Sequence, residues 1–147
     1  MAHVRQQIRD RVATLVTGLP TTGANVYKMR RFALDDSKIP AICVYTMDES
    51  SNLITVGSRT LGRTVNVAAD IIIKGSSATI SDTLDDICVS AEEAIAADFH
   101  LNGLAKSCIL TDTNITINVE GERSVASARL VYTVDYVTSI TDVETAR

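Results

Sequence analysis

The spacing of apolar residues predicts one long amphipathic helix in the middle of the chain. Between residues 79 and 99 the apolar side chains recur at helical spacing and form one stripe of Ile80, Leu84, Ile87, Cys88, Ala91 and Ile95. Such a stripe is typical of a helix that lies along a sheet. Thr79 stands three residues before Asp82 in a [ST]-x-x-[DE] pattern, so we expect the helix to begin there with a capping box.

The opposite side of this helix is acidic, and the segment carries no Lys or Arg. Asp82, Asp86 and Glu93 share the outer face, and Val89 lies among them. Most charged helix faces are simply solvated. An acidic face without compensating cations, next to an apolar residue, also suits a docking surface. The sequence leaves both interpretations open.

The rest of the chain predicts a second helix and a set of strands. Residues 3–19 have one-sided apolar spacing, and Gly18 and Pro20 mark the end of a helix. Alternating or β-rich segments predict strands at residues 26–34, 39–45, 63–74, 109–120 and 124–138. This order favours an antiparallel or mixed sheet with both helices packed on one face. We therefore expect a single α+β domain over residues 1–147.

Two segments fall outside this regular pattern. Residues 48–62 are polar and punctuated by glycine between two predicted strands, which indicates an arm or hairpin. Long loops in compact domains often carry function. Arg59 lies in this arm, and Arg63 directly follows it. The tail, residues 139–147, has little to bury, and we expect it to be loose.

Composition and charge limit the classes of function that the protein could have. A net charge of -4 argues against broad nucleic-acid binding, which needs a basic surface. Residues 1–63 carry nine Lys and Arg against five Asp and Glu, net +4, whereas residues 64–147 carry five against thirteen, net -8. If the fold keeps these halves on different faces, copies attract one another head to tail; if it mixes them, the asymmetry has no consequence.

Candidate chemistry is sparse. The three cysteines lie in apolar contexts without CxxC spacing, which predicts buried free thiols in a reducing compartment. Gly75-Ser76-Ser77 precedes a helix but lacks a phosphate-loop pattern, and His3 and His100 have no neighbours at metal-ligand spacing. We expect no enzymatic activity, cofactor or metal. No signal peptide or membrane span is indicated, so a soluble protein made in a cytoplasm is expected.

Four stretches, together with the order of elements, carry a resemblance to a known family. They are the phrase Ile39-Pro40-Ala41-Ile42-Cys43-Val44-Tyr45, the strand end Ile71-Ile72-Ile73, the helix start Ser81-Asp82-Thr83-Leu84-Asp85, and the closing strand Ala128-Arg129-Leu130-Val131-Tyr132-Thr133-Val134. In these features the chain resembles the tail terminator proteins of long-tailed phages, the family of the lambda-type minor tail protein U.

The resemblance implies a structural protein of the virion, placed at the tail or neck and assembled in the host cytoplasm. Such subunits close into a ring, expected to be a hexamer, on the finished tail tube. The ring ends polymerisation of the tube protein and offers a docking surface to the head-tail connector or neck protein. DNA passes through the central hole without specific binding, and no membrane is involved. The ring would close because a patch on each copy binds a complementary patch on the next copy, with a fixed rotation between them.

The candidate assembly interface joins basic residues of the first half to the acidic helix face. It comprises Arg30, Arg31, Arg59, Arg63, Asp82, Asp86, Val89 and Glu93. Two alternatives stay open. One is another phage neck component, a head-tail adaptor or stopper, which a tail-length phenotype would distinguish. The other is a regulatory α+β domain that binds a small ligand, which a filled apolar pocket in a monomer would favour.

Overall fold

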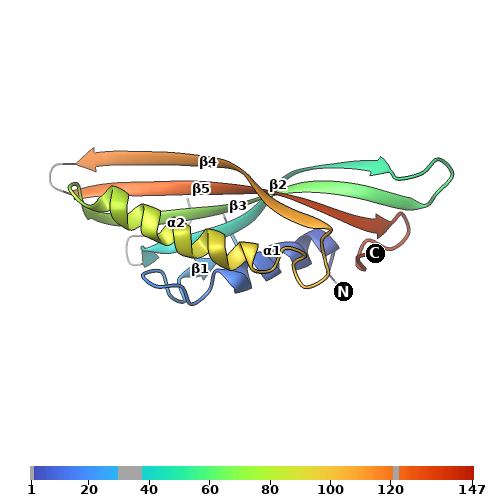
Figure 1. Ribbon diagram of the computed structural model, residues 1–147, viewed down its shortest axis with the longest axis horizontal. Helices are drawn as coiled ribbons and strands as arrows, with labels where there is room; N and C mark the ends of the chain where they lie inside the picture. Colours follow the sequence, from blue (N-terminus) through green and yellow to red (C-terminus); the bar gives the residue numbers. More distant parts are fainter. Residues whose placement is uncertain (1, 30–37, 121–122) are drawn as a thin grey trace.

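The computed structural model describes residues 2–29, 38–120 and 123–147, which form one α+β domain with a five-stranded sheet (Figure 1). In chain order its elements are α1 (Val4–Leu15), β1 (Val26–Tyr27), β2 (Ala41–Leu53), β3 (Thr60–Ser76), α2 (Ile80–Ala96), β4 (Ser107–Glu120) and β5 (Arg123–Ser139). The predicted fold class is confirmed.

The sheet is mixed, and its strand order is β1-β2-β3-β5-β4. β1 is the parallel member and pairs with β2 at Val26–Ile42 and Tyr27–Cys43. The other neighbours are antiparallel, and β3 pairs with β5 along its whole length. β4 therefore lies at one edge, and β3 lies at the centre.

Both helices cover the same face of the sheet (Figure 1). The predicted stripe of α2 is buried in full. This stripe and the buried face of α1 share one core with alternate residues of β3 and β5: Val65, Val67, Ala69, Ile71 and Ile73 in β3, and Ala126, Ala128, Leu130, Tyr132, Val134 and Tyr136 in β5. The predicted placement of both helices on one face is confirmed.

The helix ends differ in detail from the sequence prediction. Thr79 is the N-cap of α2, but its side chain makes no capping bond, so the predicted capping box is wrong. Its φ of -122° and ψ of -2° lie outside the extended region in which an N-cap hydroxyl reaches the first turn. α1 ends at Leu15 instead of residue 19, and Gly18, with φ +88°, reverses the chain in a turn that closes on Gly23.

The predicted arm is the end of a long hairpin. β2 continues to Leu53 and β3 already begins at Thr60, so the arm's two sides are strands of the main sheet. A bulge between Thr46 and Glu49 lies where the arm leaves the core. Of the strand predicted at residues 26–34, β1 forms the start, and residues 30–37 lie outside the described part of the chain.

The C-terminal tail is held against α1, so the prediction of a loose tail is wrong. The Val4 N–H donates to the Val143 carbonyl at 2.9 Å, and Gln7 Nε2 donates to the Glu144 carbonyl at 2.8 Å. The first N–H groups of a helix have no partner within the helix, and the tail supplies an acceptor for one of them. Ala146 packs on the core beside α1.

The middle of β3 is buried on both faces, although its alternation predicted a half-buried strand. Ala68 and Asp70 point away from the helices and are nevertheless buried. The Asp70 carboxylate accepts from Arg129 Nε and from the Tyr45 hydroxyl, each at 3.0 Å. These partners, on β5 and β2, make burial of the acid tolerable.

The α2 stripe can be tested by truncating one of its side chains. Leu84 is buried against the sheet, so Leu84→Ala removes apolar contacts and leaves a cavity. We expect it to lower the free energy of unfolding by about 3 kcal/mol, measured by urea denaturation. Val89 lies on the outer side of the same helix, and Val89→Ala should change that free energy by less than about 0.5 kcal/mol. Equal losses in the two variants would contradict this packing.

Candidate assembly surface

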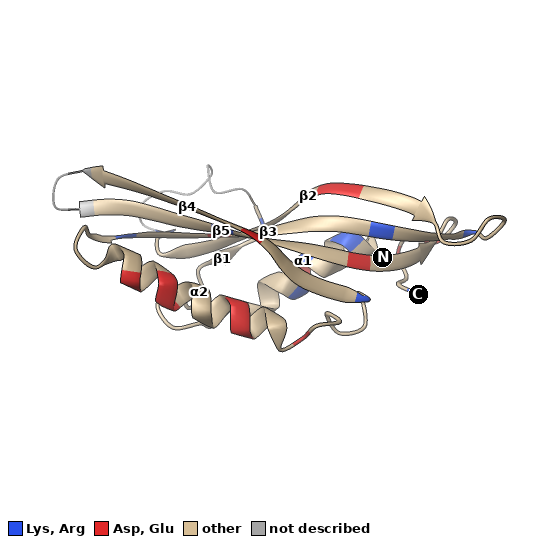
Figure 2. Cartoon of the chain, turned by 45° about the horizontal axis from the view of Figure 1, so that its top comes forward, with Lys and Arg blue, Asp and Glu red and all other residues tan. Residues whose placement is uncertain are grey.

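The acidic residues that the sequence placed on one helix face do share an exposed face of α2. Asp82, Asp86 and Glu93 are exposed, and Val89 beside them is 52% exposed. Figure 2 shows acidic positions along the length of α2. This face is therefore free to meet a partner. Arg30 and Arg31 lie outside the described residues.

Arg63 is mostly covered within the single chain, and its part in an assembly interface stays a prediction. Its side chain is 11% exposed and bonds through Nη1 to Glu49 Oε2 at 3.3 Å. Its Nε donates to Thr138 Oγ1 at 2.9 Å. The strand register places Arg63 at the base of the arm, on the face of the sheet that the helices cover. The Glu49 carboxylate lies on the same face and is mostly covered, so it needs a cation as a partner.

Glu49 is the centre of a polar cluster that joins α1 to the base of the arm. Besides Arg63, it accepts from Arg5 Nη1 at 2.6 Å and from the Tyr136 hydroxyl. Burial, followed by the bond to Glu49, raises the pKa of Tyr136, so its phenol remains a donor at neutral pH. The cluster thus fixes the base of the arm to α1 and β5.

The arm tip is apolar, although the predicted arm is polar as a whole. Leu53 and Ile54 are 52% and 56% exposed, and Val56 is 97% exposed. Arg59 is exposed at the end of the same turn. We call Leu53, Ile54, Val56 and Arg59 the arm tip. Scattered exposed apolar residues are ordinary, but a cluster on a projecting hairpin is typical of an interaction site.

A second exposed apolar set lies on edge strand β4. Ile115, Ile117 and Val119 point to the helix side of the sheet and remain exposed; we call them the β4 strip. Past the bulge between Leu110 and Asp112, residues 113–119 carry no charge. Edge strands are usually protected by charges or proline, so this uncovered end is suited to contact with another chain.

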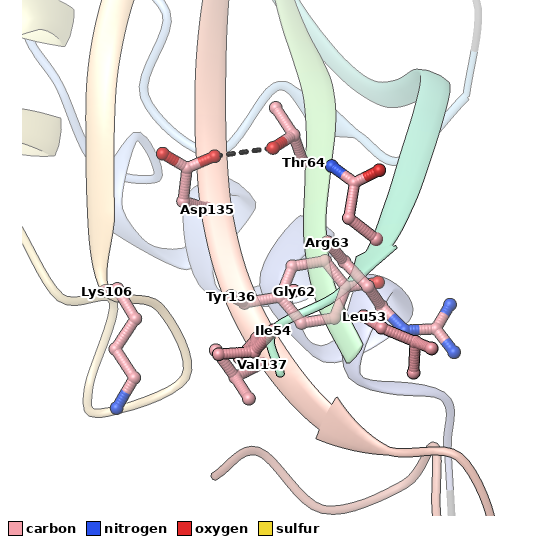
Figure 3. A pocket seen from close by; sticks show the side chains of 10 residues that line it. Leu53, Ile54, Gly62, Arg63, Thr64, Lys106, Asp135, Tyr136 and Val137 are labelled. Carbon is pink, nitrogen blue, oxygen red and sulfur yellow. Dashed lines mark hydrogen bonds between the residues drawn. The ribbon is translucent and has the colours of Figure 1, made fainter. Parts of the chain in front are cut away.

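A hollow of about 310 Å³ lies at the base of the arm (Figure 3). Lys106 and Val137 are among its lining residues, and Thr64 Oγ1 donates to Asp135 Oδ1 at 2.7 Å on its wall. The hollow is open to solvent and its lining mixes charged, polar and apolar groups. It therefore lacks the enclosed apolar character of a pocket for a small regulatory ligand.

The titratable groups of the described residues offer little chemistry. All three cysteines are buried, as predicted. Burial raises the pKa of Cys88 to about 11 and that of Cys108 to about 12, so neither is a thiolate at neutral pH. Among the residues that the structure describes, no group of three or more His, Cys, Asp or Glu could hold a metal ion. None of the described helices has the length and apolar character of a membrane span.

Comparison with known proteins finds similarity in structure and none in sequence. No protein-family model matches the chain, and no curated protein matches it in sequence. Among solved structures, the chain is similar to one in the virion of a native gene transfer agent particle, at 14% sequence identity and a TM-score of 0.36. The similarity covers 90% of this chain and 92% of that chain. A TM-score this low does not by itself identify a common function.

The Glu49 cluster can be tested by removing its charge. Glu49→Gln keeps the side-chain shape but leaves Arg63 buried without a carboxylate. Because water screens the partly exposed Arg5, we expect a loss of about 2 kcal/mol in the free energy of unfolding at pH 7. Glu93→Gln, on the exposed face of α2, is the matched control and should change it by less than about 0.5 kcal/mol. A Glu49→Gln variant as stable as the wild type would show that the cluster does not hold the arm.

Proposed function

We propose that this protein is a structural subunit of a phage tail, of the tail terminator type, and that it works by self-association. The projecting arm is the observation that carries the proposal, since a single copy leaves its apolar tip in solvent. The α+β architecture agrees with the small α+β subunits that the sequence resemblance implies. The uncovered β4 strip and the acidic α2 face provide further surfaces for neighbours.

The proposed mechanism is geometric. Each subunit binds the next through two different patches, and each is rotated relative to the one before. After a full turn the last subunit meets the first, so the subunits close into a ring, expected to be a hexamer. The ring caps the finished tail tube, stops addition of tube protein, and offers its other side to the head-tail connector or neck protein. DNA passes through the hole without specific binding, since acidic surface repels phosphate. The site of action is the virion, and no catalysis or cofactor takes part.

The function is tested by tail length and by particle shape. Light scattering and negative-stain imaging of the purified protein, alone and with tube protein, should show rings. Phage lacking the protein should make overlong tails. Tails of normal length that fail to join heads would instead identify a neck adaptor or stopper. A strict monomer under all these conditions, together with normal tails, would overturn the proposal.

The acidic face of α2 makes a separate prediction about assembly. Reversing Asp82, Asp86 and Glu93 to Lys should weaken ring formation about tenfold at low salt, because about 0.5 kcal/mol is lost for each exposed ion pair. The neutral set Asp82→Asn, Asp86→Asn and Glu93→Gln should fall between that variant and the wild type. Sedimentation at several protein concentrations measures the change. Assembly that is the same in all three proteins would exclude this face from the interface.

A further inference from the structure

The two exposed apolar sets lie at opposite ends of the molecule (Figure 1). The sheet register shows this directly: Leu53 of the arm tip pairs with Leu61 of β3, whereas Ile117 of the β4 strip is aligned through β5 with Ile73. These two β3 positions are twelve residues apart, which is a distance of roughly 40 Å along the strand. One copy therefore cannot bring its own arm tip onto its own β4 strip.

The two ends also differ in charge. Arg59 makes the arm tip basic, and Figure 2 shows a basic position at the end of the arm. One side of α2 carries Asp85 and Glu92, and we call it the acidic border. Helical spacing places both with Cys88 on that side, and both raise the pKa of the Cys88 thiol.

The position of β5 fixes which way that side of α2 faces. Tyr132 of β5 pairs with Leu110 of β4, and Glu92 and Cys108 of β4 both raise the pKa of its phenol. The Asp85–Glu92 side of α2 therefore faces the β4 edge and not α1. An apolar strip with an acidic border lies at one end of the subunit, and an apolar tip with a basic residue lies at the other.

We propose that the arm tip of one copy docks on the β4 strip of a second copy, with Val56 and Ile54 against Ile115 and Ile117 and with Arg59 beside the acidic border of α2. The contact joins different surfaces and runs head to tail, the type of contact that closes into a ring or extends into a filament. The inference rests on the proposed function in naming the contact that would close the terminator ring.

Disulfide trapping between mixed variants tests this contact directly. Val56→Cys and Ile117→Cys are mixed, oxidised mildly, and analysed without reductant; the three native cysteines are buried and should stay silent. We expect a cross-linked dimer that needs both variants. The matched control pairs Val56→Cys with Ile109→Cys, because Ile109 is 52% exposed on the opposite face of the same strand. The control should yield at least fivefold less dimer.

Charge exchange gives a second, independent readout of the same contact. Arg59→Glu in the Val56→Cys copy should lower the cross-linked yield at least threefold. Asp85→Lys with Glu92→Lys in the Ile117→Cys copy should restore it. Unfolding midpoints of all variants are compared with the wild type, since every changed side chain except that of Glu92 is exposed. Equal yields for Ile117→Cys and Ile109→Cys, or no cross-link with either, would overturn the inference.

The outcomes separate this inference from the proposed function. Rings that cap tail tubes without the Val56–Ile117 cross-link would overturn the docking contact and leave the terminator proposal standing. The expected cross-link in a protein whose loss leaves tails normal would support the docking contact and overturn the terminator proposal.

Discussion

The full-length pairing of β3 with β5 is the constraint on which the rest of the structure depends. Each strand has 17 residues, so the paired region is roughly 55 Å long. The helices that cover it are much shorter: 17 residues of α2 span roughly 25 Å and 12 residues of α1 roughly 18 Å. A strand extends more than twice as far per residue as a helix does, so helices of this size cannot cover the whole length of the sheet. Uncovered apolar surface at both ends is a consequence of that mismatch.

The two uncovered ends of the sheet differ in structure. At the arm end, the apolar core gives way to the polar residues Glu49, Arg63 and Thr138, where water begins to reach the sheet. These side chains are partners for one another, because Arg63 donates hydrogen bonds to both Glu49 and Thr138. The tail supports the same end, since the Ile140 N–H donates to the Arg59 carbonyl at 2.7 Å. At the other end, the β4 strip has no such polar transition. One end is therefore a braced projection, and the other is an open apolar surface.

Hydrophobic periodicity predicted most of the fold, because it reports directly which face of each element is buried. The α2 stripe and the alternation of β3 and β5 were read correctly for this reason. Periodicity does not report whether a covering helix reaches a given strand, so it could not show that Ile115 and Ile117 stay exposed. Nor does it give ionic partners: Glu49 joins Arg5 across 44 residues and Arg63 across 14, which no local pattern reveals. The ion pair that covers most of the Arg63 side chain was therefore not predicted.

The rigidity of the arm bears on how self-association could be specific. A flexible hairpin would lose conformational freedom on docking, and that loss would reduce affinity. Here β5 pairs with the arm as far as Thr60, and the Glu49 cluster fixes its base to α1 and β5. The angle between the arm and the β4 edge is then set by the twist of one continuous sheet and not by a hinge. A fixed angle between two different docking surfaces determines the rotation from copy to copy, and that rotation decides whether head-to-tail contacts close after a few subunits or continue without limit.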